Sequence, residues 1–329
     1  MPVISQGGYS GVGRYEELDL SNVRTYKAAE RVSKISTRNI ALPPREGMSL
    51  RNFLDSLPDV LKVKDLKILA GAIVRAKRDN LPVIAMFGGH VVKCGCLPIL
   101  IDLARRGFIT HFASNGAAAI HDVELASWGQ TSEDVAAQLE DGSFGMAADT
   151  AEILNSAARI AFRGKLGLGE SIGNLLVERE VPFGENSLVV QSCLLPIPYT
   201  VHVALGTDIV HQHPDADGAS IGDASLRDFR IFAASVAKMD GGGVVLNLGS
   251  AVLLPEVFLK ALSLARNLGN NVSNIVTANM DMIQHYRPLT NVVTRPVLSG
   301  GQGYSFTGHH EIMIPLLAAA VCEESAENG

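Results

Sequence analysis

The chain has 329 residues, of which 47% are hydrophobic and 19% charged, and its formal net charge is −6. A hydrophobic share of this size is ordinary for a globular protein and excludes an intrinsically disordered chain. The negative net charge provides no overall basic field that would attract nucleic acid. Apolar stretches such as residues 312–321 are too short to span a bilayer. We therefore expect no nucleic-acid partner and no membrane association.

The N-terminus and the cysteines indicate a compartment. Residues 1–20 contain no apolar region of the kind that marks a secretory signal peptide. The four cysteines, Cys94, Cys96, Cys193 and Cys322, are too few for a disulfide scaffold in a chain of this length. Cys94 and Cys96 form a C-x-C pair without a second pair, which argues against a structural zinc site. We predict a cytoplasmic protein with reduced thiols.

Taken in chain order, the sequence predicts an N-terminal arm over residues 1–48 and one α/β domain over 49–329. Ser49 is suited to cap a helical segment at 50–78, and from residue 82 onward short apolar runs alternate with helical patterns. The predicted strands are 82–87, 108–113, 199–204, 244–248 and 275–277. The predicted helices are 92–105, 117–126, 133–139, 149–163, 226–237, 256–266 and 312–321. This alternation predicts a doubly wound, mostly parallel, Rossmann-like sheet.

Small residues follow several of the predicted strands. They form three loops before a predicted helix: Gly88-Gly89-His90, Ser114-Asn115-Gly116 and Gly249-Ser250-Ala251. Doubly wound sheets bind ligands beyond the carboxyl ends of their strands. Glycine lets the backbone approach a phosphate, and a helix N-terminus offers free N–H groups. None of the loops is a G-x-G-x-x-G fingerprint, and the alternative interpretation is that the small residues only permit tight turns.

Two longer strings resemble motifs of deoxyhypusine synthases, which are NAD-dependent aminobutyl transferases. Residues 172–177 (IGNLLV) resemble a G-N-L-L-V string of that family, and residues 217–223 (DGASIGD) resemble its D-G-S-L-G-D string. The resemblance runs from about residue 82 to about residue 320. It implies a deoxyhypusine synthase-type fold, bound NAD, an amine or polyamine-type substrate, transferase activity and a homotetramer.

The resemblance also implies a cofactor site. The family's NAD-contacting loops resemble the three glycine-containing loops, and its N-T-A string resembles a segment ending in Thr277 and Ala278. The implied cofactor residues in these segments are Gly88, Gly89, His90, Ser114, Asn115, Gly116, Gly249, Ser250, Thr277 and Ala278.

Four acids extend this predicted site. The family carries acidic residues near the position of Asp122 and Glu124, which we expect to hold ribose hydroxyls or a substrate ammonium group. The alternative is that acids near a helix start only interact with the helix dipole. The resemblance further implies that Asp217 and Asp223 hold the cofactor or a substrate cation.

The sequence departs from the family at its catalytic lysine. Arg295-Pro296 is followed by VLSGGQGY at residues 297–304, and no lysine occurs after Lys260. Imine formation needs an amine that can lose its proton, so we expect amine chemistry without the family's covalent intermediate. The predicted catalytic residues are His211 or His213 as a general base, together with Asp223, because imidazole titrates near neutral pH.

Two other functions remain open. The H-x-H pattern at His211 and His213, with aspartates nearby, suits a metal-dependent hydrolase if a further ligand such as His90, His202 or Asp208 converges on it. The missing lysine also suits a non-catalytic homologue that binds a partner or regulates an active relative. The segment His309-His310-Glu311 is interpreted as a capping and surface feature.

Overall fold

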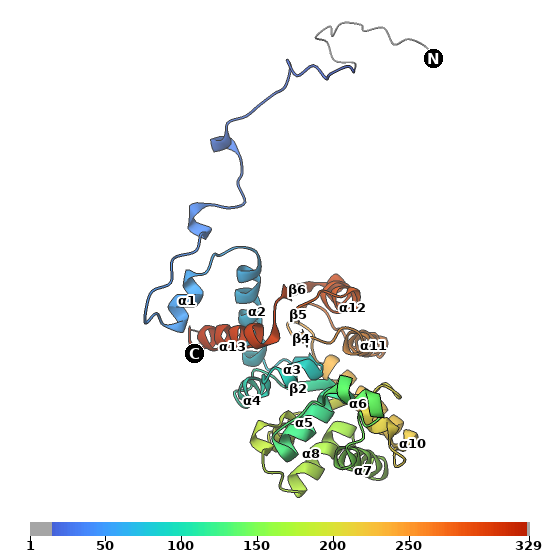
Figure 1. Ribbon diagram of the computed structural model, residues 1–329. Coiled ribbons are helices and arrows are strands. Elements are labelled where there is room, and N and C mark those ends of the chain that lie inside the picture. The colour runs from blue at the N-terminus through green and yellow to red at the C-terminus, as the bar shows by residue number, and fades with distance from the viewer. Residues whose placement is uncertain (1–14, 328–329) are drawn as a thin grey trace, which may run out of the picture. The chain divides into compact units, whose positions relative to one another are not determined.

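The computed structural model describes residues 15–327 (Figure 1). Contacts divide the chain into two units, residues 1–40 and 41–329, with the division somewhat before the predicted end of the arm at residue 48. In the first unit the described residues include two short 3-10 helices, η1 (Ala28–Glu30) and η2 (Thr37–Asn39). Among residues 15–327 we find no helix with the length and apolarity needed to cross a bilayer.

The second unit is built on a parallel sheet, which confirms the predicted fold class (Figure 1). The strands are β1 (Val83–Phe87), β2 (His111–Asn115), β3 (Tyr199–His202), β4 (Val244–Leu248), β5 (Ile275–Asp281) and β6 (Gly301–Thr307). Their spatial order is β3-β2-β1-β4-β5-β6, and all neighbouring pairs are parallel. This is a doubly wound order in which the direction of winding reverses between β1 and β4.

Helices lie on both faces of this sheet. The helices of the chain are α1 (Leu50–Ser56), α2 (Leu61–Arg78), α3 (Gly89–Lys93), α4 (Leu97–Arg105), α5 (Gly116–Trp128), α6 (Val135–Asp141), α7 (Ala148–Gly164), α8 (Leu168–Glu178), α9 (Leu188–Leu194), α10 (Gly218–Val236), α11 (Leu253–Asn267), α12 (Tyr286–Pro288) and α13 (His310–Glu327). Shorter turns are η3 (Gly184–Asn186), η4 (Ile209–Gln212), η5 (Leu289–Thr294) and η6 (Arg295–Ser299).

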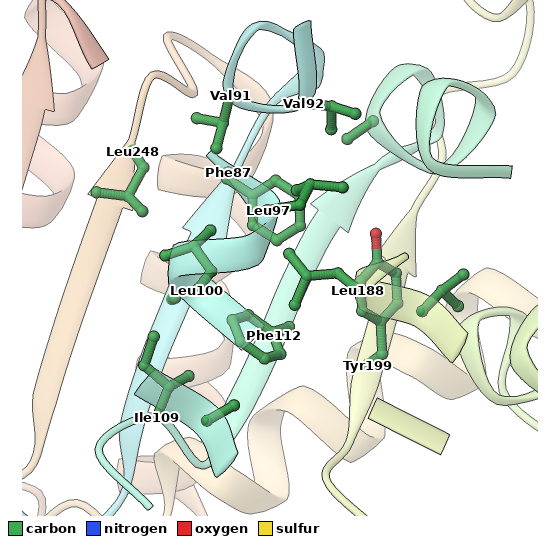
Figure 2. Close-up of a cluster of buried hydrophobic side chains, with 14 of the residues drawn as sticks. Phe87, Val91, Val92, Leu97, Leu100, Ile109, Phe112, Leu188, Tyr199 and Leu248 are labelled. Atoms are coloured by element: carbon green, nitrogen blue, oxygen red, sulfur yellow. The ribbon is translucent and has the colours of Figure 1, made fainter. Parts of the chain in front are cut away.

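Strand periodicity divides the core into two hydrophobic clusters. Successive side chains of β1 point to opposite faces, so Phe87 joins one cluster and Met86 the other. Figure 2 shows the first cluster, where the ring of Phe87 meets those of Phe112 and Tyr199 edge-on at 6.3 and 6.2 Å between centroids. Helices α2, α4, α5, α9 and α13 contribute to this cluster, and so does the start of α10 through Ile221 and Ala224. The remainder of α10 packs with α11 in the other cluster.

Several element boundaries differ from the sequence-based prediction. The predicted helix 92–105 is two helices, α3 and α4, separated at Gly95, whose φ of +69° lies in the left-handed region that favours glycine. Helix α10 begins well before the predicted residue 226, and β5 continues past the predicted residue 277. Strand β6 was not predicted, because its two glycines leave only a short alternating pattern at Tyr304 and Phe306, and its pairing with β5 defines it.

Two buried aspartates cap helices of other segments. Asp228 on α10 accepts hydrogen bonds from the N–H groups of Gly169 and Val201, at 2.9 and 2.8 Å, and so joins the start of α8 to β3. Asp122 on α5 accepts from the N–H of Val189 at 3.0 Å, in the first turn of α9. Both carboxyl groups supply acceptors to otherwise unpaired N–H groups at a helix start. Burial raises the pKa of each aspartate to about 7.

The stability of Asp228→Asn relative to the wild type is expected to increase as the pH rises from about 4 to about 7. In this range the folded protein retains a proton that an unfolded aspartate has released, so the wild type loses stability relative to the variant as pH rises. The relative gain should reach about 1–4 kcal/mol and level off above the folded pKa. Urea unfolding of both proteins at about pH 5 and about pH 8 measures the difference.

The comparison must be made between variants because other groups act in the opposite direction. Burial lowers the pKa of His111 and of His202 to about 3. Between this pKa and the ordinary histidine pKa of 6.5, the free energy of unfolding that they contribute increases as the pH rises. These histidines are common to both proteins and cancel in the difference. Leu226→Gln, an exposed change on the same helix, is the control. An equal stability difference at both pH values would contradict the prediction.

Candidate functional site

Three of the predicted loop residues meet at the carboxyl edge of the sheet. Gly88 follows β1, Asn115 ends β2 and Gly249 follows β4. A Cβ atom added to Gly88 would lie 3.6 Å from the carbonyl oxygen of Gly249 and 3.9 Å from Nδ2 of Asn115. We call the place where these residues meet the crevice, a name for this position between the strand ends. It lies where the winding reverses between β1 and β4, which is where doubly wound sheets bind ligands.

His310, the first residue of α13, forms one wall of the crevice. Its ring lies directly against Gly249, whose φ of +74° and lack of a side chain permit this contact. The ring centroid of His90 is 5.6 Å away. His310 is 1% exposed, so the predicted surface position is wrong for this residue, whereas its neighbours His309 and Glu311 are exposed as predicted. Burial lowers the pKa of His310 more than the nearby Asp281 carboxylate raises it, so the imidazole is neutral at neutral pH.

Buried amides support the crevice from the strands below. Asn247 on β4 donates to Oδ1 of Asn279 on β5 at 2.7 Å and to the carbonyl of Ser250 at 2.9 Å. Asn279 in turn donates to Oε1 of Gln284 at 2.9 Å. These bonds hold the loop after β4 in place, and the Ser250 hydroxyl accepts from the N–H of Leu254 in the first turn of α11. These amides were not among the predicted site residues, although an asparagine within an apolar strand was a visible signal.

The predicted residues Ser114, Thr277 and Ala278 are buried within strands. Thr277 donates its hydroxyl proton to the carbonyl of Val292 at 2.7 Å. Because β5 continues to Asp281, Thr277 and Ala278 lie in the middle of this strand rather than at its end. The corresponding residues at the carboxyl edge are Asn279 and Asp281.

Beside the crevice, α5 presents a histidine and a glutamate to a cavity. His121 and Glu124 are one helical turn apart and therefore share a face of α5. The same cavity, of about 220 Å³, is also lined by Lys93, Glu133 and Asp208. It adjoins the loop after β1, because a Cβ atom on Gly89 would lie 3.0 Å from Cδ2 and 3.5 Å from Nε2 of His121. A second cavity of about 470 Å³ shares Glu124 and Glu133 with it.

A hydrogen-bond network surrounds Glu124. Thr131 donates to Oε2 of Glu124, and Thr150 donates to Oε1 at 3.1 Å. Nδ1 of His121 lies 2.7 Å from the Thr131 hydroxyl. Burial by itself would raise the pKa of Glu124, but its bonds with His121, Thr131 and Thr150 together outweigh burial and lower it. Glu124 is therefore a carboxylate at neutral pH, whereas its neighbour Asp122 faces α9 on another side of the helix.

The N-terminus of α5 is already in contact with an internal carboxylate. Asp208 lies against Gly116, leaving no room there for a side chain. Burial raises the pKa of Asp208, and the nearby His211 opposes this shift. Nδ1 of His211 accepts from the backbone N–H groups of Gly206 and Asp208, each at 3.2 Å. Asn115 caps the helix through a bond from the N–H of Ala118 at 2.9 Å.

The other predicted acids and histidine have local partners. His213 donates from Nε2 to the carbonyl of Gly145 at 2.9 Å. Asp217 is the N-cap of α10, so the DGASIGD string forms the start of a helix. Asp223 forms an ion pair with Arg227 at 3.0 Å. The roles of His211, His213, Asp217 and Asp223 in catalysis or cofactor binding stay predictions.

The structure provides no support for the metal-dependent alternative. His211 and His213 each direct a ring nitrogen to the backbone rather than to a shared centre. Within the described part of the chain, no three His, Cys, Asp or Glu side chains are grouped so that they could hold a metal ion.

Comparisons with known proteins find similar structures but no similar sequence family. No protein-family model matches the chain, and no curated protein matches it. A conserved LOR/SDH protein from Methanococcus maripaludis S2 is similar in structure, with a TM-score of 0.52 and 15% identity, over 86% of this chain and 74% of that one. AgrE, solved as a ternary complex with ornithine and NAD+, has a TM-score of 0.51 and 13% identity, over 82% of this chain.

The chain spans only 34% of AgrE. A protein described as a deoxyhypusine synthase from Entamoeba histolytica also matches, with a TM-score of 0.45 and 10% identity, over 84% of this chain and 93% of that one. This last likeness is too low to add to the argument. At these identities the comparisons show that the chain shares a Rossmann-like α/β fold with the LOR/SDH protein and with AgrE.

Proposed function

We propose that this protein is an enzyme that binds a nicotinamide dinucleotide at the crevice and acts on an amine-bearing small molecule in the adjoining cavity. The observation that carries the proposal is the meeting of Gly88, Asn115 and Gly249 where the winding of the sheet reverses. Ligands of doubly wound proteins bind at this place for a geometric reason, since the flanking loops diverge there.

The residues on the Gly88 side of the crevice fit a dinucleotide. Gly88 has an extended backbone, with a φ of −106°, so its conformation does not itself require glycine. The atoms nearest to an added Cβ would lie 3.6 and 3.9 Å away, at ordinary contact distance, and the lack of a side chain leaves the backbone of Gly88 uncovered. The Gly249 side is filled by His310, so we place the dinucleotide over Gly88 and Asn115. Bound NAD would supply a hydride acceptor.

The adjoining cavity has a charge that suits an amine. Its lining includes the acids Glu124, Glu133 and Asp208, with Lys93 as its basic side chain. Carboxylates bind an ammonium group through charge-assisted hydrogen bonds. AgrE, a part of which has a similar fold, was solved in complex with ornithine and NAD+, which supports the choice of an amine and a dinucleotide as ligands. The absence of a lysine after Lys260 favours amine oxidation or transfer without a lysine imine.

Assembly and compartment belong to the same proposal. The resemblance to deoxyhypusine synthases supports a homotetramer, and the four free cysteines suit a reducing compartment such as the cytoplasm. Light scattering coupled to size-exclusion chromatography tests the homotetramer directly.

Replacing Gly88 by alanine is expected to weaken NAD+ binding at least about tenfold, because the added methyl group occupies the space over the backbone. Calorimetric titration of purified, cofactor-free protein with NAD+ measures the change. The wild type should bind saturably. Gly222→Ala on α10 is the matched control, since its Cβ would meet nothing within 4 Å.

Two outcomes would overturn the proposed cofactor site. The wild type would show no NAD+ binding, or Gly88→Ala would bind as tightly as Gly222→Ala. Saturable binding without turnover of any amine would instead favour the non-catalytic alternative.

A further inference from the structure

The hydrogen bonds of Thr131 determine which ring nitrogen of His121 carries the proton. A threonine hydroxyl has one proton to donate. Thr131 donates it to Oε2 of Glu124, whose lowered pKa keeps it a carboxylate with no proton of its own. The contact of 2.7 Å between Thr131 and Nδ1 of His121 therefore requires Nδ1–H to donate to the Thr131 oxygen. Neutral His121 then carries its proton on Nδ1 and a lone pair on Nε2.

The free nitrogen faces the candidate site. Nε2 of His121 lies 3.5 Å from the position of an added Gly89 Cβ, in the loop that follows β1. The side chain lines the cavity shared with Glu124, and no hydrogen bond engages Nε2 within residues 15–327. The loop that presents Thr131 is strained, since Ser132 has a φ of +80°, and such strain tends to gather at functional sites.

The other two candidate histidines have the opposite tautomer. Nδ1 of His211 accepts two backbone N–H groups, so its proton lies on Nε2. His213 donates from Nε2 to a backbone carbonyl, so its proton lies there as well. A ring nitrogen that carries a proton cannot accept another one, so neither Nε2 is available as a base. The unprotonated nitrogen of each ring is Nδ1, which in His211 already accepts from the backbone.

We propose that His121 is the general base of this site, and that Thr131 and Glu124 are positioning residues that hold it with Nε2 unprotonated toward the cavity. In this arrangement the base, His121, is oriented by hydrogen bonds to Thr131 and through it to Glu124. The inference rests on the proposed function for its substrate, an amine, and the proton comes from the ammonium nitrogen of that substrate. The N–H bond breaks, its electron pair stays on the amine, and an N–H bond forms at Nε2. Glu124 stabilises the resulting imidazolium through Thr131.

Nuclear magnetic resonance of the ring nitrogens tests the assignment without any ligand. Protein labelled with ¹⁵N only at histidine gives long-range proton–nitrogen correlations whose pattern identifies the tautomer, and His121→Gln assigns the signal. We expect Nδ1–H for His121 and Nε2–H for His211 and His213 in the same spectrum. Thr131→Val should lower the fraction of His121 with the Nδ1–H pattern, because the nearer acceptor is lost and only Glu124 Oε2, at 3.8 Å, remains.

Two further variants separate a specific role from a general structural one. Thr131→Ser restores the hydroxyl and should restore the Nδ1–H pattern. Thr150→Val removes a different hydroxyl from Glu124 and should leave the His121 pattern intact. An Nε2–H pattern for His121 in the wild type, or an unchanged pattern in Thr131→Val, would overturn the inference. Because this spectrum needs no dinucleotide, a failure of NAD+ to bind would count against the proposed function alone.

Discussion

Replacing His121 by glutamine is expected to lower the turnover of an amine substrate about 10²–10⁴-fold, the range over which general bases contribute to rate. Glutamine keeps approximate size and polarity but cannot accept a proton near neutral pH. The affinity for NAD+ should remain within about twofold of wild type, since His121 borders the crevice loop without forming it. The measurement is the formation of reduced dinucleotide, followed by absorbance across a panel of amines.

His211→Gln and His213→Gln are the matched controls, and they also test the residues that sequence analysis selected. Both side chains bond to the backbone, so their loss is expected to alter local stability more than the rate of the chemical step. If His121→Gln retained full turnover while His211→Gln lost it, the base would be His211. The general-base role of His121 would then be wrong, whatever its tautomer.

Phe232→Ala is expected to destabilise the protein by about 3–5 kcal/mol. The ring is fully buried on α10 and packs edge-on against His111 and His202, at centroid distances of 5.5 and 5.4 Å. Its removal leaves a cavity between α10 and the sheet and exposes a network in which Thr200 bridges the two histidines. Urea unfolding at neutral pH, with the slope checked for two-state behaviour, gives the free energy.

Phe229→Ala on the same helix is the control. Phe229 is only partly buried against the same cluster, so its loss should cost clearly less, about 1–2 kcal/mol. Equal losses for the two variants would contradict the view that Phe232 anchors α10 to this face. A loss below about 1 kcal/mol for Phe232→Ala would do so as well.

Local patterns in the sequence determined the fold class and part of the site. The apolar run VVLNL is β4 with the predicted bounds, and Ser49 caps α1 as predicted. These features depend on residues that are neighbours in the sequence, which explains why they could be predicted. The glycines after β1 and β4 were also visible as small residues behind apolar strands. Because parallel strands place their carboxyl ends at one edge, such loops converge wherever the sheet forms.

Tertiary structure alone decided which polar side chains reach that edge. His310 is far from Gly249 in sequence, and only the crossing of α13 brings its ring into the crevice. Strand β6 depends on pairing with β5, since Gly301 and Gly303 weaken the strand preference of Tyr304, Phe306 and Thr307. The four-residue string HDVE predicts that His121 and Glu124 share a helix face, but not that this face borders a cavity. The tautomer of His121 depends on Thr131, in a loop whose path the sequence pattern does not specify.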